Sequence, residues 1–313
     1  MTVREGSPES ELNGVAVLVT GGTGFIGSHV VRTLLELGAD VTVADRNPHP
    51  DPDVRCVTGE LADPAVRRRA VRPGTRAIIH LAAVTSVLRS LEDPQDVYEV
   101  NVEVTQGLLE LARAEGVGSF VLASTNAVTG DVGAARIDEN IPLRPLTPYG
   151  ATKAAGEMLL SAYSAAYGVT GTSLRFANVY GPGMRHKDSF VPRLMRAALD
   201  GSTIQVYGDG TQLRDYVHVH DIVRGMLLAW RAGHTGPLIL GSGRSESVND
   251  LIEAARQVTG APIPVDHVPG KPGEMPAVVL DVSAARALGY EPAYDLTGGL
   301  KTVWSDFTDG APG

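Results

Sequence analysis

Tyr149 and Lys153 are the residues of this chain whose types and spacing first suggest chemistry. They lie four residues apart behind Pro148, in a segment with helical periodicity, so both side chains project from one helix face. A tyrosine with its ordinary pKa of about 10 is a poor base at neutral pH unless a nearby positive charge stabilises the phenolate. Lys153 supplies such a charge, which makes the pair a candidate for proton abstraction.

A hydroxyl group precedes this pair at Thr125. The apolar run 120–123 has the length of a strand and is followed directly by Ser124, Thr125 and Asn126. Ligands of open α/β sheets bind beyond the carboxyl ends of the strands. Thr125 is therefore expected where it could complete a site with Tyr149 and Lys153.

A glycine-rich turn near the N-terminus has the pattern of a dinucleotide-binding loop. Gly21, Gly24 and Gly27 stand between the apolar run 15–19 and a helical pattern, where a backbone without side chains can approach a pyrophosphate. Asp45, at the end of the next strand, can accept hydrogen bonds from a ribose diol and would repel a 2′-phosphate, which favours NAD over NADP. The adjacent Arg46 could stack on adenine or hold a 2′-phosphate.

The elements that would position these residues alternate along the chain. Strand-length runs are followed by segments with helical periodicity, which predicts an α/β protein with a Rossmann-type doubly wound parallel sheet. The expected strands cover 15–19, 40–45, 54–57, 77–83, 120–123 and 172–176, and the expected longer helices cover 94–115 and 149–167.

Frequent prolines after Asn178 predict a smaller, mixed α/β C-terminal domain. The expected division is a flexible tail over 1–13, a dinucleotide-binding domain over 14–177 to which 213–235 return, and a second domain over 178–212 and 236–313.

Composition excludes several classes of function. The formal net charge of −9 and the 5% aromatic content argue against a nucleic-acid partner. The single cysteine, Cys56, allows no internal disulfide, and with an acidic N-terminus and no long apolar run the chain is expected in the cytoplasm, away from membranes. No metal site is expected, and His80, His218 and His220 are interpreted as structural residues.

The order of motifs resembles that of the extended short-chain dehydrogenases/reductases, in the NAD-dependent nucleotide-sugar epimerase/dehydratase family and most like a UDP-sugar 4-epimerase. The similarity extends from Val15 to Trp304. The matching motifs are Gly21 to Gly27, His80 to Ala83, Asn101, Thr125, Tyr149 to Lys153, Arg175 to Gly181, Tyr207 to Gly210 and Arg214 to Val217.

The resemblance implies a role for each matching residue. Tyr149 would be the general base, Lys153 would hold the nicotinamide ribose and lower the tyrosine pKa, and Thr125 would bind the reacting hydroxyl. The implied NAD contacts are Gly21, Gly24, Phe25, Ile26, Gly27, Asp45, Arg46, Glu60, Leu61, Leu81, Ala82, Ala83, Asn101, Tyr149, Lys153 and Phe176. The implied contacts to a nucleoside-diphosphate sugar are Thr85, Thr125, Asn126, Asn178, Arg185, Ser189, Phe190, Gln205, Tyr207, Arg214, Lys271 and Glu274. Arg214 would pair with the diphosphate, and Arg185, His186 or Lys187 could reach a sugar carboxylate.

Two positions favour epimerisation over other reactions of the family. Dehydratases carry an Asp-Glu pair just after the catalytic threonine, and decarboxylases usually carry a glutamate at the second position, whereas this chain has Asn126 and Ala127. The implied reaction is 4-epimerisation through a transient 4-keto sugar, with UDP-glucose/UDP-galactose or UDP-glucuronate/UDP-galacturonate as substrate pairs. A UDP-glucuronate decarboxylase, another 4-keto oxidoreductase and a catalytically silent NAD-binding sensor remain as alternatives.

The resemblance also implies a homodimer in which each subunit contributes two helices to a four-helix bundle. The candidate helices are 94–115, with Val97, Val100, Val104 and Leu108, and 149–167, with Ala155, Met158, Leu159 and Ala162.

Overall fold

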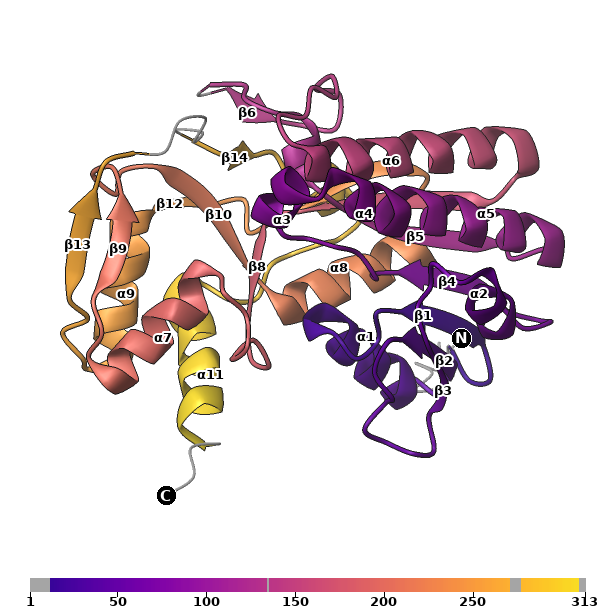
Figure 1. The fold of residues 1–313 in the computed structure, drawn as a ribbon, viewed down its shortest axis with the longest axis horizontal. Helices are drawn as coiled ribbons and strands as arrows, with labels where there is room; N and C mark the ends of the chain where they lie inside the picture. The colour runs from indigo at the N-terminus through magenta and orange to yellow at the C-terminus, as the bar shows by residue number, and fades with distance from the viewer. Residues whose placement is uncertain (1–11, 134, 271–276, 310–313) are drawn as a thin grey trace, which may run out of the picture. The chain divides into compact units, whose positions relative to one another are not determined.

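The computed structural model describes residues 12–133, 135–270 and 277–309, and its contacts divide the chain into two units (Figure 1). Of the described residues, unit 1 comprises 12–130, 143–175 and 226–238, and unit 2 comprises 131–133, 135–142, 176–225, 239–270 and 277–309. Residues 213–225, expected in the dinucleotide-binding domain, thus lie in unit 2, because strand β10 (Leu213–His218) pairs with strands β8 and β12 of that unit. Residues 131–142 join unit 2 because β6 (Arg136–Ile137) pairs with β14 (Val279–Leu280).

Unit 1 is built on a seven-stranded sheet with the order β11-β7-β5-β4-β1-β2-β3. The registered pairs β1–β2, β1–β4, β2–β3 and β4–β5 are all parallel, as the alternation of strands and helices predicts. Its strands are β1 (Ala16–Thr20), β2 (Asp40–Asp45), β3 (Arg55–Thr58), β4 (Ala77–His80), β5 (Ser119–Thr125), β7 (Thr170–Phe176) and β11 (Gly236–Leu240). The carboxyl ends of β1, β2, β4 and β5 therefore lie at one edge of the sheet, where the glycine loop, Asp45 and Thr125 follow them.

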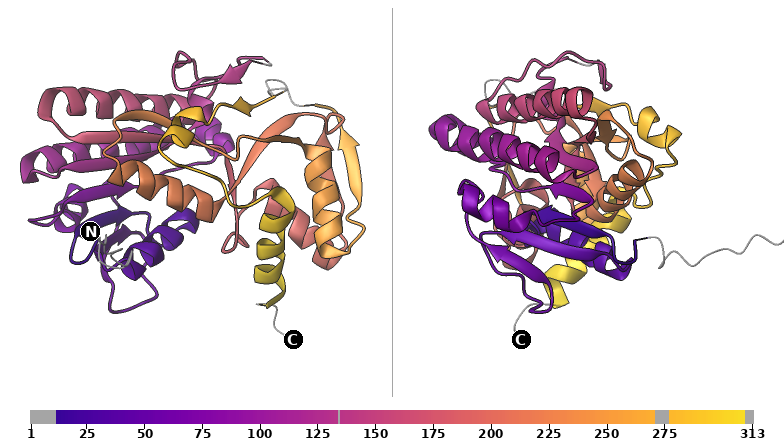
Figure 2. Two further views of the ribbon diagram at one scale, coloured as in Figure 1. Left: turned by 180° about the vertical axis from the view of Figure 1, so that it is seen from behind. Right: turned by 90° about the vertical axis from the view of Figure 1, so that its right-hand side faces the viewer.

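Helices cover both faces of this sheet. Its helices are α1 (Phe25–Glu36), α2 (Pro64–Ala70), α3 (Val87–Glu92), α4 (Pro94–Tyr98), α5 (Val104–Glu115), α6 (Pro148–Tyr167) and the second half of α8 (Val219–Arg231). Helices α5 and α6 lie side by side on one face (Figures 1 and 2). Leu18, Ile78 and Phe120 of the sheet form a continuous core with Leu108 of α5 and Leu160 of α6. Among the described helices, none is long and apolar enough to span a bilayer.

The segment expected as one helix over 94–115 is continuous but not regular. Helices α4 and α5 are joined by the π-helical segment η2 (Glu99–Glu103). Val97, Val104 and Leu108 of this segment are fully buried within unit 1. Val104 and Leu108 belong to the core that includes the sheet, and Val97 is enclosed where α4 contacts α6, so the expectation that these three face a second subunit is corrected. Val100 is half-buried, and its place in an interface stays a prediction.

Unit 2 is a mixed assembly of three small sheets and helices, as the proline pattern predicts. The strand orders are β12-β10-β8, β13-β9 and β14-β6. The remaining strands are β8 (Asn178–Tyr180), β9 (Ile204–Tyr207), β12 (Ser245–Ser247) and β13 (Val265–Val268), and the helices are α7 (Phe190–Asp200), α9 (Val248–Thr259), α10 (Ser283–Ala287) and α11 (Leu296–Asp309). The strands β8, β9 and β10 and the start of α7 bring together the residues of the cavity described below.

Candidate active site

The loop between β1 and α1 has the close backbone packing that a dinucleotide needs. Gly21 has a φ of +69°, and a Cβ at this position would lie 2.8 Å from the backbone nitrogen of Ala82. A Cβ at Gly27 would lie 2.0 Å from the carbonyl oxygen of Gly21. Gly24 precedes α1 and supplies no side-chain cap. The first-turn amides of α1 are therefore a candidate site for a pyrophosphate.

Asp45 lies beside this loop at the end of β2. Its carboxylate accepts hydrogen bonds from the backbone nitrogens of Thr23, at 3.0 Å, and Asn47, at 3.2 Å. Two backbone amides thus fix the carboxylate next to the glycine loop, and its oxygens keep further acceptor capacity for a ribose diol. These features of the loop and of Asp45 fit an NAD molecule.

The other proposed cofactor contacts lie at the carboxyl edge of the same sheet. The Thr20 hydroxyl accepts hydrogen bonds from the backbone nitrogens of Leu81, at 3.2 Å, and Ala82, at 3.3 Å, which hold the chain after β4 close to the glycine loop. Phe25 and Ile26 are half-buried in the first turn of α1, Arg46 and Glu60 are exposed, and Leu61 and Phe176 are buried. Their contacts to NAD stay predictions.

Asn101 has a positioning role within unit 1. Its amide donates to the Val84 carbonyl and to the Thr152 hydroxyl, each at 3.0 Å, and accepts a hydrogen bond from the Val84 nitrogen at 2.9 Å. Both amide donors are therefore used to hold the loop after β4 against α6. Its location in the π-helical segment explains how it reaches both, and a direct contact to the cofactor stays a prediction.

Helix α6 and the end of β5 bring together Thr125, Tyr149 and Lys153. Thr147 caps α6 by accepting a hydrogen bond from the Gly150 nitrogen at 3.1 Å, and Pro148 occupies the first turn. Lys153 is 6% exposed, and its ammonium donates to the Ala123 carbonyl at 2.9 Å. Thr125 hydrogen-bonds to the Tyr149 phenol. The three side chains predicted for catalysis thus lie at one place in unit 1.

Burial dominates the pKa values of Tyr149 and Lys153, and the expected lowering of the tyrosine pKa by Lys153 stays a prediction. Burial raises the pKa of Tyr149 to about 12, and the hydrogen bond from Thr125 offsets this only in part. Burial also lowers the pKa of Lys153 to about 8, against the opposing attraction of Glu157. The ammonium donates to the Ala123 carbonyl, and a phenol whose pKa is raised to about 12 is protonated at neutral pH.

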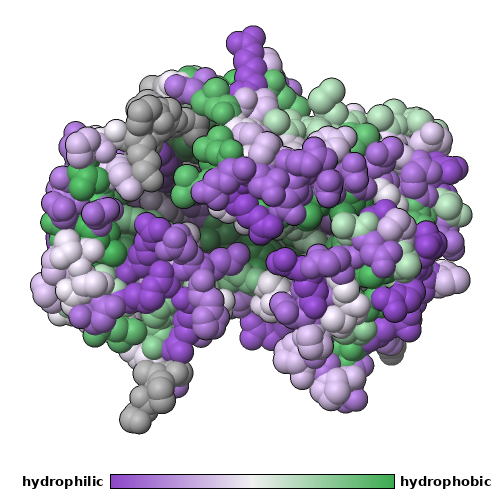
Figure 3. Space-filling view, viewed as in Figure 1, coloured by the Kyte–Doolittle hydropathy of each residue, from purple (hydrophilic) through white to green (hydrophobic). Residues whose placement is uncertain are grey.

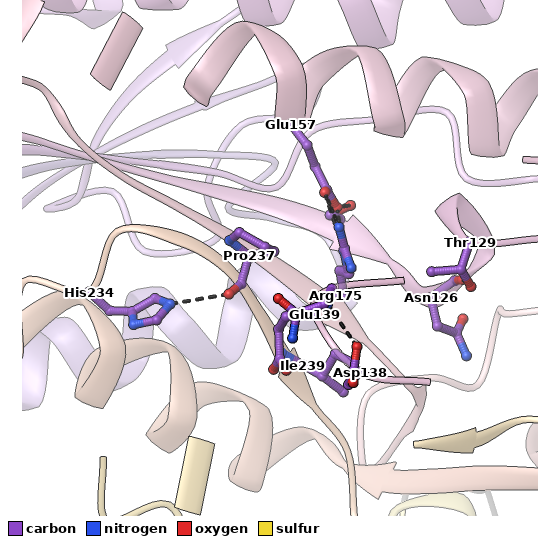
Figure 4. Close-up of polar contacts among 11 residues, drawn as sticks. Asn126, Thr129, Asp138, Glu139, Glu157, Arg175, His234, Pro237 and Ile239 are labelled. Carbon is purple, nitrogen blue, oxygen red and sulfur yellow. Dashed lines mark hydrogen bonds and ion pairs between the residues drawn. The ribbon is translucent and has the colours of Figure 1, made fainter. Parts of the chain in front are cut away.

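Glu157 and Arg175 form a buried ion pair that the sequence analysis did not single out. The Arg175 guanidinium donates to Glu157 from Nη2 at 2.8 Å and from Nε at 3.1 and 3.2 Å (Figure 4). The Ser124 hydroxyl donates to the same carboxylate at 2.5 Å. Two features of the sequence could have indicated this pair: Glu157 lies one helical turn after Lys153, and Arg175 is the first residue of the motif Arg175 to Gly181. The pair anchors α6 to β5 and β7 directly beside the catalytic group.

Unit 2 contains a cavity of about 280 Å³ that collects most of the residues predicted to bind the nucleotide sugar. Asn178, Ser189, Phe190, Gln205, Tyr207 and Arg214 all line it. Sequence reasoning missed Arg193, Gln212 and Tyr216, which also line it. Arg193 lies three residues after Phe190, the first residue of α7, so the two side chains share a helix face. The prediction that Phe190 faces the cavity could therefore have indicated Arg193 as well.

Arg185 is placed differently from the expectation. Its guanidinium donates to the Asp306 carbonyl, lies 3.9 Å from the Asp306 carboxylate and stacks over the Phe307 ring. It is not among the cavity-lining residues, because contacts to α11 hold it elsewhere. Lys271 and Glu274 lie outside the described residues. Thr85 is exposed, and Asn126 is half-buried beside Thr129, whose hydroxyl donates to its carbonyl (Figure 4).

His80 and His218 each have hydrogen-bond or stacking partners that account for their positions. His80 is buried between the hydroxyls of Thr20 and Thr105, and burial lowers its pKa to about 3. His218 stacks on Tyr294 and contacts the Thr302 hydroxyl at 2.9 Å. These contacts give His80 and His218 packing roles.

Comparison with known sequences matches residues 17–240 to the NAD dependent epimerase/dehydratase family. A UDP-glucose 4-epimerase of Corynebacterium glutamicum is 33% identical over 92% of this chain and 94% of that protein. A dTDP-glucose 4,6-dehydratase of Streptomyces griseus is 36% identical over 91% of each chain. Relatives with either reaction are thus similar over nearly their whole length.

Comparison with solved structures gives the same family. The UDP-glucose 4-epimerase of Thermotoga maritima, solved with UDP-glucose, has a TM-score of 0.90 and 32% identity and covers 94% of this chain and 99% of that one. MoeE5, solved in complex with UDP-glucuronic acid and NAD, has a TM-score of 0.86 and 36% identity and covers 95% of this chain and 100% of that one.

Proposed function

The chain belongs to the NAD-dependent epimerase/dehydratase family, and on this premise we propose that it interconverts the carbon-4 epimers of a UDP-linked hexose or hexuronic acid through a transient 4-keto sugar. The substrate pairs are UDP-glucose/UDP-galactose and UDP-glucuronate/UDP-galacturonate. The observation that carries the proposal is the grouping of Thr125, Tyr149 and the buried Lys153, with no acidic side chain at positions 126 and 127.

The side chains of unit 1 divide the proton chemistry among them. Bound NAD supplies a reversible hydride acceptor, the chemistry that lets a secondary alcohol pass through a ketone. Tyr149 takes the proton of the carbon-4 hydroxyl and later returns it, and Thr125 holds this hydroxyl by a hydrogen bond. Lys153 binds the ribose of the cofactor and places a positive charge near the phenolate that Tyr149 becomes.

The absence of an acidic side chain at positions 126 and 127 favours epimerisation over dehydration. Removal of water from carbons 5 and 6 of a sugar needs its own acid and base. Asn126 and Ala127 follow Thr125, and neither side chain can exchange a proton at neutral pH. Epimerisation needs no second acid/base pair, so the groups of unit 1 suffice.

Recognition of the nucleotide is assigned to the unit 2 cavity. Phe190 and Tyr207 offer apolar surface, Gln205 offers an amide for the base, and Arg214 offers a guanidinium that matches the geometry of phosphate oxygens. A UDP-linked sugar combines these chemical features, and relatives solved with UDP-glucose and UDP-glucuronic acid support this ligand class.

The proposal is tested by incubating the purified protein, without added cofactor, with UDP-glucose, UDP-galactose, UDP-glucuronate and dTDP-glucose separately. We expect one UDP-sugar to become an equilibrium mixture with its carbon-4 epimer, followed by proton NMR of the sugar ring. Release of carbon dioxide with formation of a pentose would identify a decarboxylase. Formation of a 4-keto-6-deoxy sugar would identify a dehydratase. Absence of turnover with added NAD would point to an NAD-binding sensor.

Replacement of Asp45 by asparagine is expected to weaken NAD binding roughly 10- to 100-fold, because charge-assisted hydrogen bonds to the ribose diol are lost. Asparagine retains an oxygen that can accept from the Thr23 nitrogen, so the loop is preserved. The measurement is calorimetric titration of NAD and NADP into protein stripped of nucleotide. Asp53→Asn, an exposed carboxylate after the same strand, is the matched control. Equal NAD affinity of Asp45→Asn and the parent would remove Asp45 from the site.

We also propose a homodimer formed through helix α6. Met158 is 65% exposed, Ala162 is exposed, and Ala155 and Leu159 are half-buried along the same helix. Mildly apolar residues cover the surface over α6 (Figure 3), and α4, which packs on α6, adds Tyr98 at 46% exposure. This face supports the expectation that 149–167 contributes to the dimer interface. The buried Val97 and Val104 of α4 and α5 are not part of that interface.

Met158→Glu is expected to convert the dimer to a monomer, because a carboxylate buried in an apolar interface has no partner. Light scattering at micromolar concentration measures the change. Leu199→Glu, at a residue of α7 that is 52% exposed, is the matched control and should leave the mass unchanged. A parent protein that is monomeric under these conditions would contradict the dimer.

A cytoplasmic location is part of the same proposal. It is supported by the single cysteine and by the cofactor and nucleotide-sugar chemistry, and fractionation of cells that express the tagged protein would test it.

A further inference from the structure

The cavity of unit 2 has a strongly cationic wall in a protein that is acidic overall. Among the described residues that line it, Arg193 and Arg214 are cationic and none is anionic, although the formal net charge of the chain is −9. The first turn of α7 also borders it, through Phe190 and Val191, and Ser189 makes no side-chain cap there. The N-terminal end of a helix and guanidinium groups both favour a diphosphate, which carries two negative charges.

The guanidinium of Arg193 is bound by the carboxylate of Asp188, a residue that does not line the cavity. Its Nε and Nη2 donate to Oδ1 and Oδ2 of Asp188, each at 2.6 Å, so the whole fork of the guanidinium is engaged. Asp188 is 77% exposed and Arg193 is 46% exposed. Water and salt screen this exposed pair, so even its bidentate geometry is broken at a smaller cost than that of a buried pair. A phosphate in the cavity can therefore compete with Asp188 for Arg193.

The surroundings of Arg193 fit this competition. Asp188 raises the pKa of Arg193 through its hydrogen bond, and the cavity residue Tyr207 lies close enough to add to the rise. Asp188 has a second cation at 3.9 Å in Arg196, which remains beside the carboxylate if Arg193 moves away. Arg196 itself is fixed by donating to the carbonyls of Arg185 and Lys187.

We propose that Arg193 is a second phosphate ligand of the bound nucleotide and that Asp188 competes with the nucleotide for its guanidinium. This inference rests on the proposed function and adds a residue that sets affinity for the diphosphate. The side chain exchanges a bidentate contact with one carboxylate for a contact with the diphosphate, which carries two negative charges where Asp188 carries one. Asp188 thereby lowers the affinity for the nucleotide.

The test is calorimetric binding of UDP and of uridine to the full-length parent protein, Arg193→Gln, Asp188→Asn and the double variant. Arg193→Gln is expected to weaken UDP binding roughly 10-fold or more, because charge-assisted hydrogen bonds to phosphate are lost, and to leave uridine binding unchanged. Asp188→Asn is expected to strengthen UDP binding by about 2- to 5-fold, in keeping with the weakness of an exposed ion pair. In the Arg193→Gln background, Asp188→Asn should have no effect on UDP.

Asp200→Asn provides the control for a general charge effect. It removes the same charge from the last residue of α7, seven residues after Arg193 and therefore about 10 Å further along the helix axis, beyond the screening length of about 8 Å at physiological salt. Its UDP affinity should equal that of the parent. Because Asp188 and Asp200 are both exposed, the Tm of Asp188→Asn and of Asp200→Asn should equal that of the parent.

The outcomes separate this inference from the proposed function. A parent protein that binds UDP with an affinity independent of Arg193, or an Asp188→Asn variant that binds UDP more weakly, would overturn the inference alone. An Asp188→Asn effect that persists without Arg193 would also overturn it. A parent protein that does not bind UDP would overturn the proposed function and the inference together.

Discussion

The Tyr149→Phe variant is expected to epimerise its substrate roughly 1,000-fold more slowly than the parent, within the range that positioned general bases contribute. The change removes the phenol oxygen that hydrogen-bonds with Thr125 and leaves the ring in place. NAD and UDP affinities should therefore remain close to those of the parent. The measurement is kcat for the interconversion of the UDP-sugar identified by NMR.

Tyr167→Phe is the matched control for this variant, because it makes the same chemical change on the same helix at a residue that is 55% exposed. Its kcat should equal that of the parent. A Tyr149→Phe protein that retains more than about a tenth of the parent rate would contradict the role of Tyr149 as general base.

The Lys153→Met variant is expected to lose roughly 100-fold in rate, since it removes, at nearly constant volume, the buried positive charge that is proposed to stabilise the phenolate of Tyr149. It should also bind NAD more weakly, because the ammonium that is proposed to hold the ribose is absent. Tyr149→Phe and Lys153→Met thus differ in a measurable way. The first lowers kcat alone, and the second lowers both kcat and the fraction of NAD that the purified protein carries.

Lys153 also makes the stability of the parent depend on pH in a way that the methionine variant does not. Burial lowers the pKa of Lys153 to about 8 from 10.5, so between these pH values the unfolded chain binds more protons than the folded chain. The cost of the buried ammonium is therefore fully present below about pH 8 and disappears as the pH rises toward 10.5.

Thermal unfolding of the two proteins measured from pH 7 to 10.5 tests this sign. The Tm of the parent, stripped of nucleotide, should rise relative to that of Lys153→Met across this window. A Tm difference that is constant with pH would indicate that Lys153 is not held in a strongly desolvated site in the folded chain.

The buried Glu157–Arg175 pair gives a structural reason for the rigidity of the catalytic group. Three donor atoms fix the Glu157 carboxylate, one on Ser124 of β5 and two on Arg175 of β7. Glu157 lies one turn from Lys153 on α6. Loss of one partner of such a pair leaves a buried charge without compensation and destabilises a protein strongly. Substitutions at either residue would therefore mix effects on folding with effects on catalysis, which is why the sharper tests use Tyr149 and Lys153.

The sequence by itself determined most elements of unit 1 and the identity of its chemical groups, but β11, whose residues were expected in the second domain, was not predicted. Strands expected over 15–19, 40–45, 120–123 and 172–176 are observed as β1, β2, β5 and β7 with ends shifted by at most two residues. The expected helix 149–167 is observed as α6, beginning one residue earlier at Pro148. These features are encoded locally, because the period of apolar residues, glycine spacing and helix-capping residues act within one element.

The tertiary structure decided which residues face one another, and this could not be read from the chain. Val104 and Leu108 look like candidates for an interface by their helical spacing, but packing on the sheet buries them in the subunit's own core. Arg185 and Arg193 are two arginines of one short segment. Contacts to α11 direct the first to Asp306, and the start of α7 places the second on the cavity wall. The direction of such long side chains depends on partners far away in the sequence, which local periodicity does not encode.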